Sequence, residues 1–211
     1  MKTVALRKRI ARSVLACSML VGATTSAVAS PAVGQPAPAF TATDVDGKTV
    51  RLADFRGKYV VLEWTNPGCP FVRKHYQQSG NMPALQKEFT ARGVAWLAVN
   101  STEPGHPDYL PPAQLSKWFV EQGARPTVAL MDESGTVGRA YGARTTPHMY
   151  IVDPAGKLVY AGGIDSIRSA DAADIKTATN YVREALGQAL AGKPIATATS
   201  TPYGCSVKYA R

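Results

Sequence analysis

Side chains that bind metal ions are scarce in this 211-residue chain, which has three cysteines and three histidines. The histidines are far apart in the sequence, and the cysteines lack the close spacing of a zinc or copper motif. A site made of Cys69, Cys205 and His148 would form only if the fold brought them together. We therefore expect no bound metal and no other cofactor, and copper handling by Cys69 and His148 is kept as an alternative.

A long apolar run is also missing. The apolar segment at residues 14–21 is too short to cross a bilayer. It follows five positive charges in residues 1–12 and precedes Ala27-Val-Ala29, a pattern typical of a secretory signal peptide and its cleavage site. We expect residues 1–29 to be removed on export. The remaining chain would then be periplasmic or secreted, with no stable insertion in the membrane.

Strong charge of one sign is missing once the signal segment is set aside. Removal of its five positive charges lowers the formal net charge from +9 to about +4. No basic stripe with interleaved aromatic residues occurs, so we expect no nucleic-acid partner. The length suits one domain with a full core. We assign residues 30–194 to that domain and residues 195–211 to a polar C-terminal tail that carries Cys205.

The order of the expected elements indicates an α/β fold. An N-terminal hairpin turns at Asp46-Gly47, and the continuous apolar runs at 59–64 and 94–99 predict buried parallel strands. Helices are expected from residue 69 onward and at 81–93, 115–123, 136–141 and 175–189, and further strands at 127–131, 148–152 and 158–161. Alternating strands and helices followed by a late hairpin predict a mixed central sheet with helices on both faces.

Cys69 lies at the expected start of a helix. It follows the turn-forming run Asn66-Pro67-Gly68 and precedes Pro70, and proline is favourable in the first helical turn because its missing N–H would be unpaired there. Unpaired N–H groups and the helix dipole stabilise a thiolate at such a position, and Arg73 adds positive potential one turn further on. The sequence thus predicts a nucleophilic thiol that is open to solvent, with a buried inert cysteine as the alternative.

Two other residues are candidates for the same chemistry. Glu63 interrupts an apolar strand, where a carboxylate is costly unless it has a function or a partner. It would exchange protons with the Cys69 thiol, or else pair with an Arg or Lys near the sheet edge. Cys205 is a resolving thiol for Cys69, the partner in a permanent structural disulfide, or an unrelated tail thiol. An oxidising compartment favours some pairing of the two.

A proline precedes the expected strand at 148–152, and proline cannot donate to a β ladder. A cis bond between Thr146 and Pro147 would turn the backbone of Thr146 outward, where it would bind an extended thiol substrate. A trans loop proline is the alternative.

These segments together resemble the thioredoxin-like redoxin superfamily, near its alkyl hydroperoxide reductase / thiol-specific antioxidant (AhpC/TSA) branch. The resemblance covers roughly residues 35–190 and rests on Val60-Val-Leu-Glu-Trp64, Asn66-Pro-Gly-Cys-Pro-Phe-Val72, Thr146-Pro147 and Tyr150-Ile-Val-Asp-Pro154 with Gly156. It implies a thioredoxin-like fold, with Cys69 at the first active-site cysteine, Pro147 at the cis-proline and Glu63 at the buried acid. Asn66, Pro70, Thr146 and Pro147 would contact the substrate. The tail segment Tyr203-Gly-Cys-Ser-Val-Lys208 also resembles one in some exported redoxin-domain proteins.

Two departures from the family's motifs limit the reaction. Val72 replaces the second cysteine of C-x-x-C, so dithiol exchange within the helix start is impossible. Leu62 and Asn66 stand where peroxiredoxins have Pro and Thr of P-x-x-x-T-x-x-C. The sequence predicts an exported thiol-dependent oxidoreductase that acts on a disulfide-bearing protein or a peroxide, with Cys69 as nucleophile and Cys205 as candidate resolving thiol. A non-catalytic binding module with a structural Cys69–Cys205 disulfide is the alternative.

Overall fold

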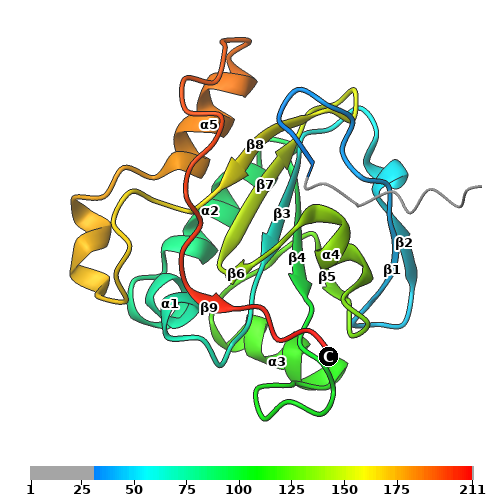
Figure 1. Ribbon diagram of the computed structural model, residues 1–211. Coiled ribbons are helices and arrows are strands. Elements are labelled where there is room, and N and C mark those ends of the chain that lie inside the picture. Colours follow the sequence, from blue (N-terminus) through cyan, green and yellow to red (C-terminus); the bar gives the residue numbers. More distant parts are fainter. Residues whose placement is uncertain (1–30, 211) are drawn as a thin grey trace, which may run out of the picture.

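The computed structural model describes residues 31–210 (Figure 1). The expected signal peptide, residues 1–29, therefore lies outside the described residues. Between residues 31 and 210, no helix combines the length and apolar character needed to span a membrane.

A seven-stranded mixed sheet forms the centre of the molecule (Figure 1). Its strands are β1 (Thr41–Asp44), β2 (Thr49–Arg51), β3 (Val60–Trp64), β4 (Ala95–Asn100), β5 (Val128–Met131), β7 (His148–Val152) and β8 (Leu158–Gly162), in the spatial order β2-β1-β5-β4-β3-β7-β8. Strands β3, β4 and β5 are parallel, whereas β7 and β1 join this group antiparallel, each with its own hairpin partner. The mixed sheet and the N-terminal hairpin expected from the sequence are both confirmed.

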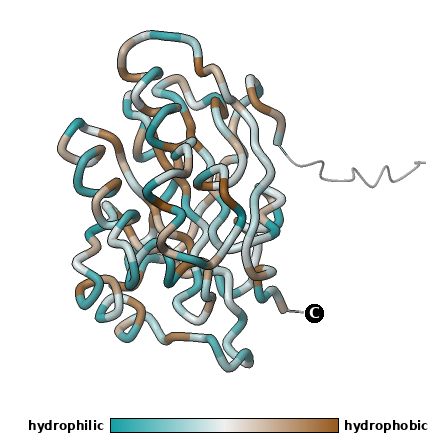
Figure 2. Tube along the Cα trace, turned by 90° about the vertical axis from the view of Figure 1, so that its left-hand side faces the viewer, coloured by the Kyte–Doolittle hydropathy of each residue, from teal (hydrophilic) through white to brown (hydrophobic). Residues whose placement is uncertain are grey.

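Helices cover both faces of the sheet. They are α1 (Pro70–Arg73), which continues into a π-helical turn η2 (Lys74–Gln78), α2 (Asn81–Thr90), α3 (Pro112–Glu121), α4 (Thr136–Tyr141) and α5 (Tyr181–Leu190), with 3-10 turns η1 (Leu52–Phe55) and η3 (Ala172–Lys176). Side chains from α1, α2, α3 and α5 form one apolar core, and α4 packs into a second core on the opposite face. Hydrophilic and hydrophobic stretches alternate along the helical parts of the tube in Figure 2, as expected for helices with one buried face.

Strand β3 shows why the sequence reads as a continuous apolar run. Val61 belongs to the core beneath α1 and α2, whereas Leu62 and Trp64 belong to the core beneath α4. Successive side chains of a strand point to opposite faces, so a strand covered on both faces buries every residue. The same alternation places the Glu63 carboxylate on the α1 and α2 side.

The single helix predicted over 175–189 is wrong in its first turns. The chain forms the short turn η3, then becomes extended at Asn180, and α5 begins only at Tyr181. The Asn180 side chain accepts a hydrogen bond from the Arg183 N–H (2.9 Å), and the Tyr181 N–H donates to the Ile164 carbonyl (3.1 Å). An asparagine cap and a backbone bond to the neighbouring loop thus prevail over the apolar periodicity that favoured one long helix.

The C-terminal tail, in which the sequence shows no clear period, packs along the domain. The Ser200 N–H donates to the Ala161 carbonyl of β8 (3.2 Å), and the tail then passes α1 (Figure 1). There it forms β9 (Cys205–Ser206), which pairs antiparallel with β6 (Thr145–Thr146) in a separate two-stranded sheet. The tail thereby reaches the end of the domain at which Cys69 lies.

Candidate thiol site

The turn before Cys69 is built by Asn66. Its side-chain oxygen accepts a hydrogen bond from the Gly68 N–H (2.8 Å), and its carbonyl accepts one from the Cys69 N–H (3.0 Å). Its side-chain amide donates to the Asp108 carboxylate (3.2 Å). Both ends of the buried Asn66 side chain are thus used to shape the loop, and the substrate contact of this residue stays a prediction.

The helix start predicted at Cys69 is confirmed. Cys69 is the residue before α1, Pro70 is the first helical residue, and the Arg73 N–H donates to the Cys69 carbonyl (3.0 Å). Pro70 is exposed beside the cysteine. The Arg73 side chain is exposed as well, and its Nε donates to the Pro67 carbonyl (3.0 Å). Arg73 is therefore directed at the loop before Cys69, and its role toward a thiolate stays a prediction.

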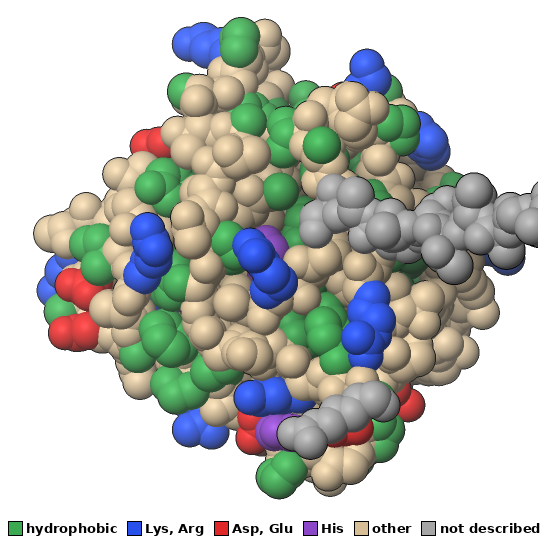
Figure 3. All heavy atoms as spheres, in the orientation of Figure 1, with side chains coloured by type: hydrophobic (Ala, Val, Ile, Leu, Met, Phe, Trp, Pro, Cys, Tyr) green, Lys and Arg blue, Asp and Glu red, His purple; other side chains and the backbone are tan. Residues whose placement is uncertain are grey.

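The sulfur of Cys69 is covered, contrary to the expectation of a thiol open to solvent. Cys69 is 1% exposed, and its thiol donates a hydrogen bond to the Thr146 carbonyl (3.1 Å). The covering segment is the tail, because Cys205 of β9 is the register partner of Thr146. On the face over which the tail runs, uncharged surface predominates and Lys and Arg side chains are scattered (Figure 3). The closed arrangement thus protects Cys69 from solution.

Cys205 lies against Cys69. Cys205 packs against the core cluster that contains Cys69, and both cysteines are free in this structure. Burial, followed by the hydrogen bond and charge of Cys69, raises the pKa of the Cys205 thiol to about 12. The hypothesis that Cys205 is a tail thiol unrelated to the Cys69 site is therefore wrong. A resolving role and a structural disulfide remain.

The edge predicted to bind a substrate is occupied. The Thr146–Pro147 bond is cis, as the sequence suggested. The backbone of Thr146, however, faces Cys205 across the β6–β9 ladder, so the chain's own tail takes the place assigned to an extended thiol substrate. A partner would reach this backbone only after the tail has left.

Gly204 allows the tail to approach so closely. A Cβ atom at this position would lie 2.1 Å from the Thr146 carbonyl oxygen, and the φ angle of Gly204 is +134°. Both the contact and the backbone conformation exclude a side chain without movement of the tail. The absence of a side chain at residue 204 is thus a condition for the covered state of Cys69.

The carboxylate of Glu63 is fully buried beneath the sheet's helical layer. Its oxygens accept hydrogen bonds from the Tyr76 hydroxyl (2.6 Å), the Trp96 indole N–H (2.7 Å) and the Gln86 amide (3.3 Å). Burial raises the pKa of Glu63, and these hydrogen bonds oppose the shift. The alternative of a basic partner at the sheet edge is wrong, since all three donors are neutral. Proton exchange with Cys69 stays a prediction.

The structure does not assemble the metal site that the copper-handling alternative requires. Between residues 31 and 210, no three His, Cys, Asp or Glu side chains are grouped so that they could hold a metal ion. The His148 ring nitrogen Nδ1 lies 3.3 Å from both the Arg144 N–H and the Tyr150 hydroxyl. Burial, and then the charge of Arg144, lowers the pKa of His148 to about 3. The set of Cys69, Cys205 and His148 is therefore not assembled.

Sequence reasoning missed one polar cluster next to this site. Lys74 and His75 follow α1 directly, and both are buried together with Asp165 and the tail residue Tyr203. The only signal in the sequence was that the polar residues Lys74 and His75 stand directly before the apolar Tyr76. Their partners are distant in sequence, so no spacing pattern identified them.

Replacement Gly204→Ala is expected to expose Cys69. The new Cβ would force β9 away from Thr146, so alkylation of Cys69 by iodoacetamide should become at least about tenfold faster. The rate is measured on the Cys69 peptide by mass spectrometry. Gly192→Ala is the matched control, because Gly192 also has a positive φ but its Cβ would meet no atom within 4 Å. Equal rates in both variants would contradict the covering role of the tail.

Replacement Glu63→Gln is expected to flatten the pH dependence of stability. The pKa of Glu63 in the folded protein lies above its ordinary value of 4.5. The protonated carboxyl group therefore contributes its full stability below pH 4.5, and this contribution is lost as the pH rises through the pKa of the folded protein. The free energy of unfolding, measured by urea denaturation, should therefore fall less in this variant from pH 4.5 to neutral pH. Glu184→Gln, on the exposed side of α5, should leave the slope unchanged. A slope equal to that of the unmodified protein in Glu63→Gln would refute the assignment.

Comparison with known proteins agrees with this geometry. Residues 33–161 match the AhpC/TSA family. Thiol-disulfide oxidoreductase ResA of Geobacillus thermodenitrificans is 33% identical over 128 residues, which cover 60% of this chain and 67% of that protein. ResA of Bacillus subtilis is 29% identical over 126 residues, covering 60% of this chain and 64% of that protein.

Solved structures support the predicted fold. A hypothetical protein from Sinorhizobium meliloti aligns with a TM-score of 0.72 at 25% identity, covering 86% of this chain and 97% of that chain. An uncharacterized conserved protein from Geobacillus kaustophilus aligns with a TM-score of 0.71 at 31% identity, covering 85% and 93%. The thioredoxin domain of a thiol-disulfide oxidoreductase from Bacteroides vulgatus aligns with a TM-score of 0.50 at 28% identity, covering 70% and 97%. The fold is thioredoxin-like, and with a family match over more than half of its length the chain belongs to the AhpC/TSA family.

Proposed function

We propose that this protein is a thiol-disulfide oxidoreductase whose two active thiols are Cys69 and Cys205. The observation that carries the proposal is that both cysteines meet at one residue: β9 pairs Cys205 with Thr146, and the Thr146 carbonyl accepts a hydrogen bond from the Cys69 thiol. The chain has no second cysteine in the first turn of α1, where Val72 stands. The ResA relatives are named thiol-disulfide oxidoreductases, which supports the same class of reaction.

The reaction proceeds in two exchange steps. The Cys69 thiolate attacks one sulfur of a partner disulfide, a mixed disulfide forms, and the released partner thiolate takes up a proton. The Cys205 thiol then loses its proton and attacks the Cys69 sulfur, the Cys69–Cys205 disulfide forms, and the partner's second sulfur leaves as a thiolate that takes up that proton. The partner disulfide gains two electrons, and the dithiol of this chain loses them. The reverse sequence oxidises a partner dithiol.

The order of the two thiols follows from their surroundings. The pKa of Cys205 is raised to about 12, so little of this thiol is ionised at neutral pH in the closed arrangement. Cys69 stands directly before the first turn of a helix and beside the Thr146 edge where a partner segment would dock, so we take it as the first nucleophile. Its 1% exposure requires that β9 move before a partner sulfur can reach it.

The same movement frees the edge at Thr146 and Pro147. A departing tail leaves the Thr146 backbone groups without their β partners, and an extended segment of the partner would replace them. Partner docking and exposure of Cys69 thus depend on one event. The partner is a protein with an accessible disulfide or dithiol, encountered outside the cytoplasm if residues 1–29 direct export.

Glu63 supplies the proton transfers in this proposal. Its raised pKa allows the carboxyl group to hold a proton closer to neutral pH than an exposed glutamate does. The group lies under the first helical layer, in contact with Tyr76, which follows the helix that begins after Cys69.

Oxidised glutathione tests the two-step route. The reduced unmodified protein should form the Cys69–Cys205 disulfide and release two molecules of glutathione thiol. Cys205→Ser should stop as a stable mixed disulfide with glutathione on Cys69, because no second thiol resolves it. Peptide mapping by mass spectrometry distinguishes both products and separates the two reacting cysteines from Cys17, the third cysteine, which lies in the expected signal peptide.

Two results would overturn the proposal. In the first, the reduced protein forms no Cys69–Cys205 disulfide under any glutathione ratio. In the second, the disulfide forms but resists excess dithiothreitol in the folded protein, which would identify a structural bond in a non-catalytic binding module.

A further inference from the structure

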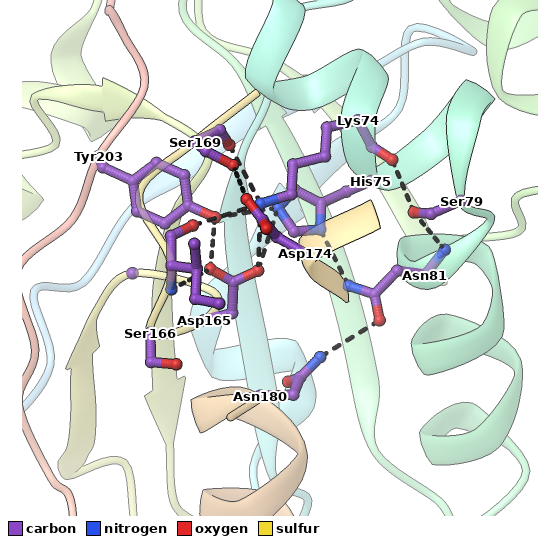
Figure 4. Close-up of polar contacts among 12 residues, drawn as sticks. Lys74, His75, Ser79, Asn81, Asp165, Ser166, Ser169, Asp174, Asn180 and Tyr203 are labelled. Carbon is purple, nitrogen blue, oxygen red and sulfur yellow. Dashed lines mark hydrogen bonds and ion pairs between the residues drawn. The ribbon is translucent and has the colours of Figure 1, made fainter. Parts of the chain in front are cut away.

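The buried cluster behind α1 connects the active-site helix to the tail (Figure 4). Lys74 and His75 lie on η2, directly after α1, whereas Asp165 follows β8 and Tyr203 belongs to the tail. All four side chains are buried, with relative exposure of 6% or less. Tyr203 stands two residues before Cys205, so whatever holds this ring also fixes where the second thiol lies.

The ring of Tyr203 packs over the active-site helix. It meets the Phe71 ring edge-on, with 5.8 Å between ring centroids, and the Lys74 ammonium lies 5.7 Å from its centre. Phe71 is two residues after Cys69. The tail is therefore seated on the same short helix that presents the first thiol.

The Tyr203 hydroxyl is held from two sides. It donates a hydrogen bond to Asp165 Oδ1 (2.5 Å), and it lies 3.3 Å from His75 Nε2. The side-chain nitrogen of Asn81 lies 3.0 Å from His75 Nδ1 and can only donate to it, so Nδ1 accepts. The neutral ring therefore carries its proton on Nε2 and donates a hydrogen bond from there to the Tyr203 hydroxyl. Burial, and then the charge of Lys74, lowers the pKa of His75 to about 3, which keeps this ring neutral.

The charges in the cluster balance one another. The Lys74 ammonium lies 3.7 Å from Asp165 Oδ2 and donates to the carbonyls of Ile167 and Ser169 (3.3 and 3.0 Å). Asp165 Oδ1 accepts from the Ile167 N–H (3.2 Å) and from Tyr203, whereas its Oδ2 has no hydrogen bond among the described residues. The Tyr203 hydroxyl is thus one of two donors to a buried carboxylate, an arrangement stronger than a bond to a neutral acceptor.

We propose that Tyr203, held by Asp165 and His75, is a positioning residue that keeps the tail across Cys69. This inference rests on the proposed function, because it names the group that sets how often the dithiol opens to a partner. When the tail lifts, the hydroxyl leaves Asp165 and the ring leaves Phe71, and Cys69 and the Thr146 edge become accessible together. The free energy of this anchor then determines the fraction of molecules in the open state.

Replacement Tyr203→Phe tests the anchor. It keeps the ring on Phe71 and removes only the hydroxyl, so the protein retains its packing. In a Cys205→Ser background, which has no internal disulfide, iodoacetamide alkylation of Cys69 should become about tenfold faster, since a hydrogen bond to a charged group contributes about that factor. The rate is read from the Cys69 peptide by mass spectrometry in the full chain.

Tyr141→Phe in the same background is the matched control. Tyr141 is also fully buried and also donates from its hydroxyl, but to the Pro38 carbonyl in the core beneath α4 (2.8 Å). Its removal should lower the urea midpoint of unfolding without changing the alkylation rate of Cys69. The pair of variants separates opening of the tail from a general loss of stability.

Each outcome decides the inference. Faster alkylation in Tyr203→Phe alone supports the anchor. No acceleration in Tyr203→Phe, or an equal acceleration in both variants, overturns it. The glutathione experiment on the unmodified protein fails or succeeds independently of this result, because the alkylation assay uses a chain in which the Cys69–Cys205 bond cannot form.

Discussion

The pairing of the tail with β6, the strand directly before cis Pro147, is the interaction on which the site depends. A two-residue ladder between β9 and β6 brings Cys205 to Thr146, and Thr146 in turn accepts the Cys69 thiol. Glycine at residue 204 lets the two backbones meet. Without this contact, Cys69 would stand alone at the start of its helix, with no second thiol within reach.

Local sequence signals predicted the parts of the molecule that local physics determines. The apolar runs gave the buried strands, Pro70 after Cys69 marked the helix start, and Thr146-Pro147 marked the cis bond. Each of these depends on a few neighbouring residues, so a single sequence contains the relevant information. The buried acid at Glu63 could be predicted for the same reason, because a carboxylate within an otherwise apolar strand stands out in the sequence.

The remaining features depend on contacts between distant segments. Nothing near Cys205 indicates that its backbone will pair with Thr146, and nothing near Lys74 indicates that Asp165 will balance its charge. The prediction that the Cys69 sulfur is accessible was wrong for this reason, because the tail segment that covers it shows no periodic pattern in the sequence. The start of α5 was misplaced because Asn180 bonds into a loop that periodicity does not reveal.

Moving the second thiol from the helix to a tail changes how reactivity is controlled. In a C-x-x-C pair both sulfurs are fixed on one turn of helix, whereas here the second sulfur reaches the first only while the tail is seated. The seated tail also covers Cys69 and fills the Thr146 edge. In the proposed mechanism, one equilibrium therefore governs attack by Cys69, docking of a partner and resolution by Cys205. Because the contacts of Tyr203 with Asp165 and His75 exist only in the seated state, they bias that equilibrium without touching either sulfur.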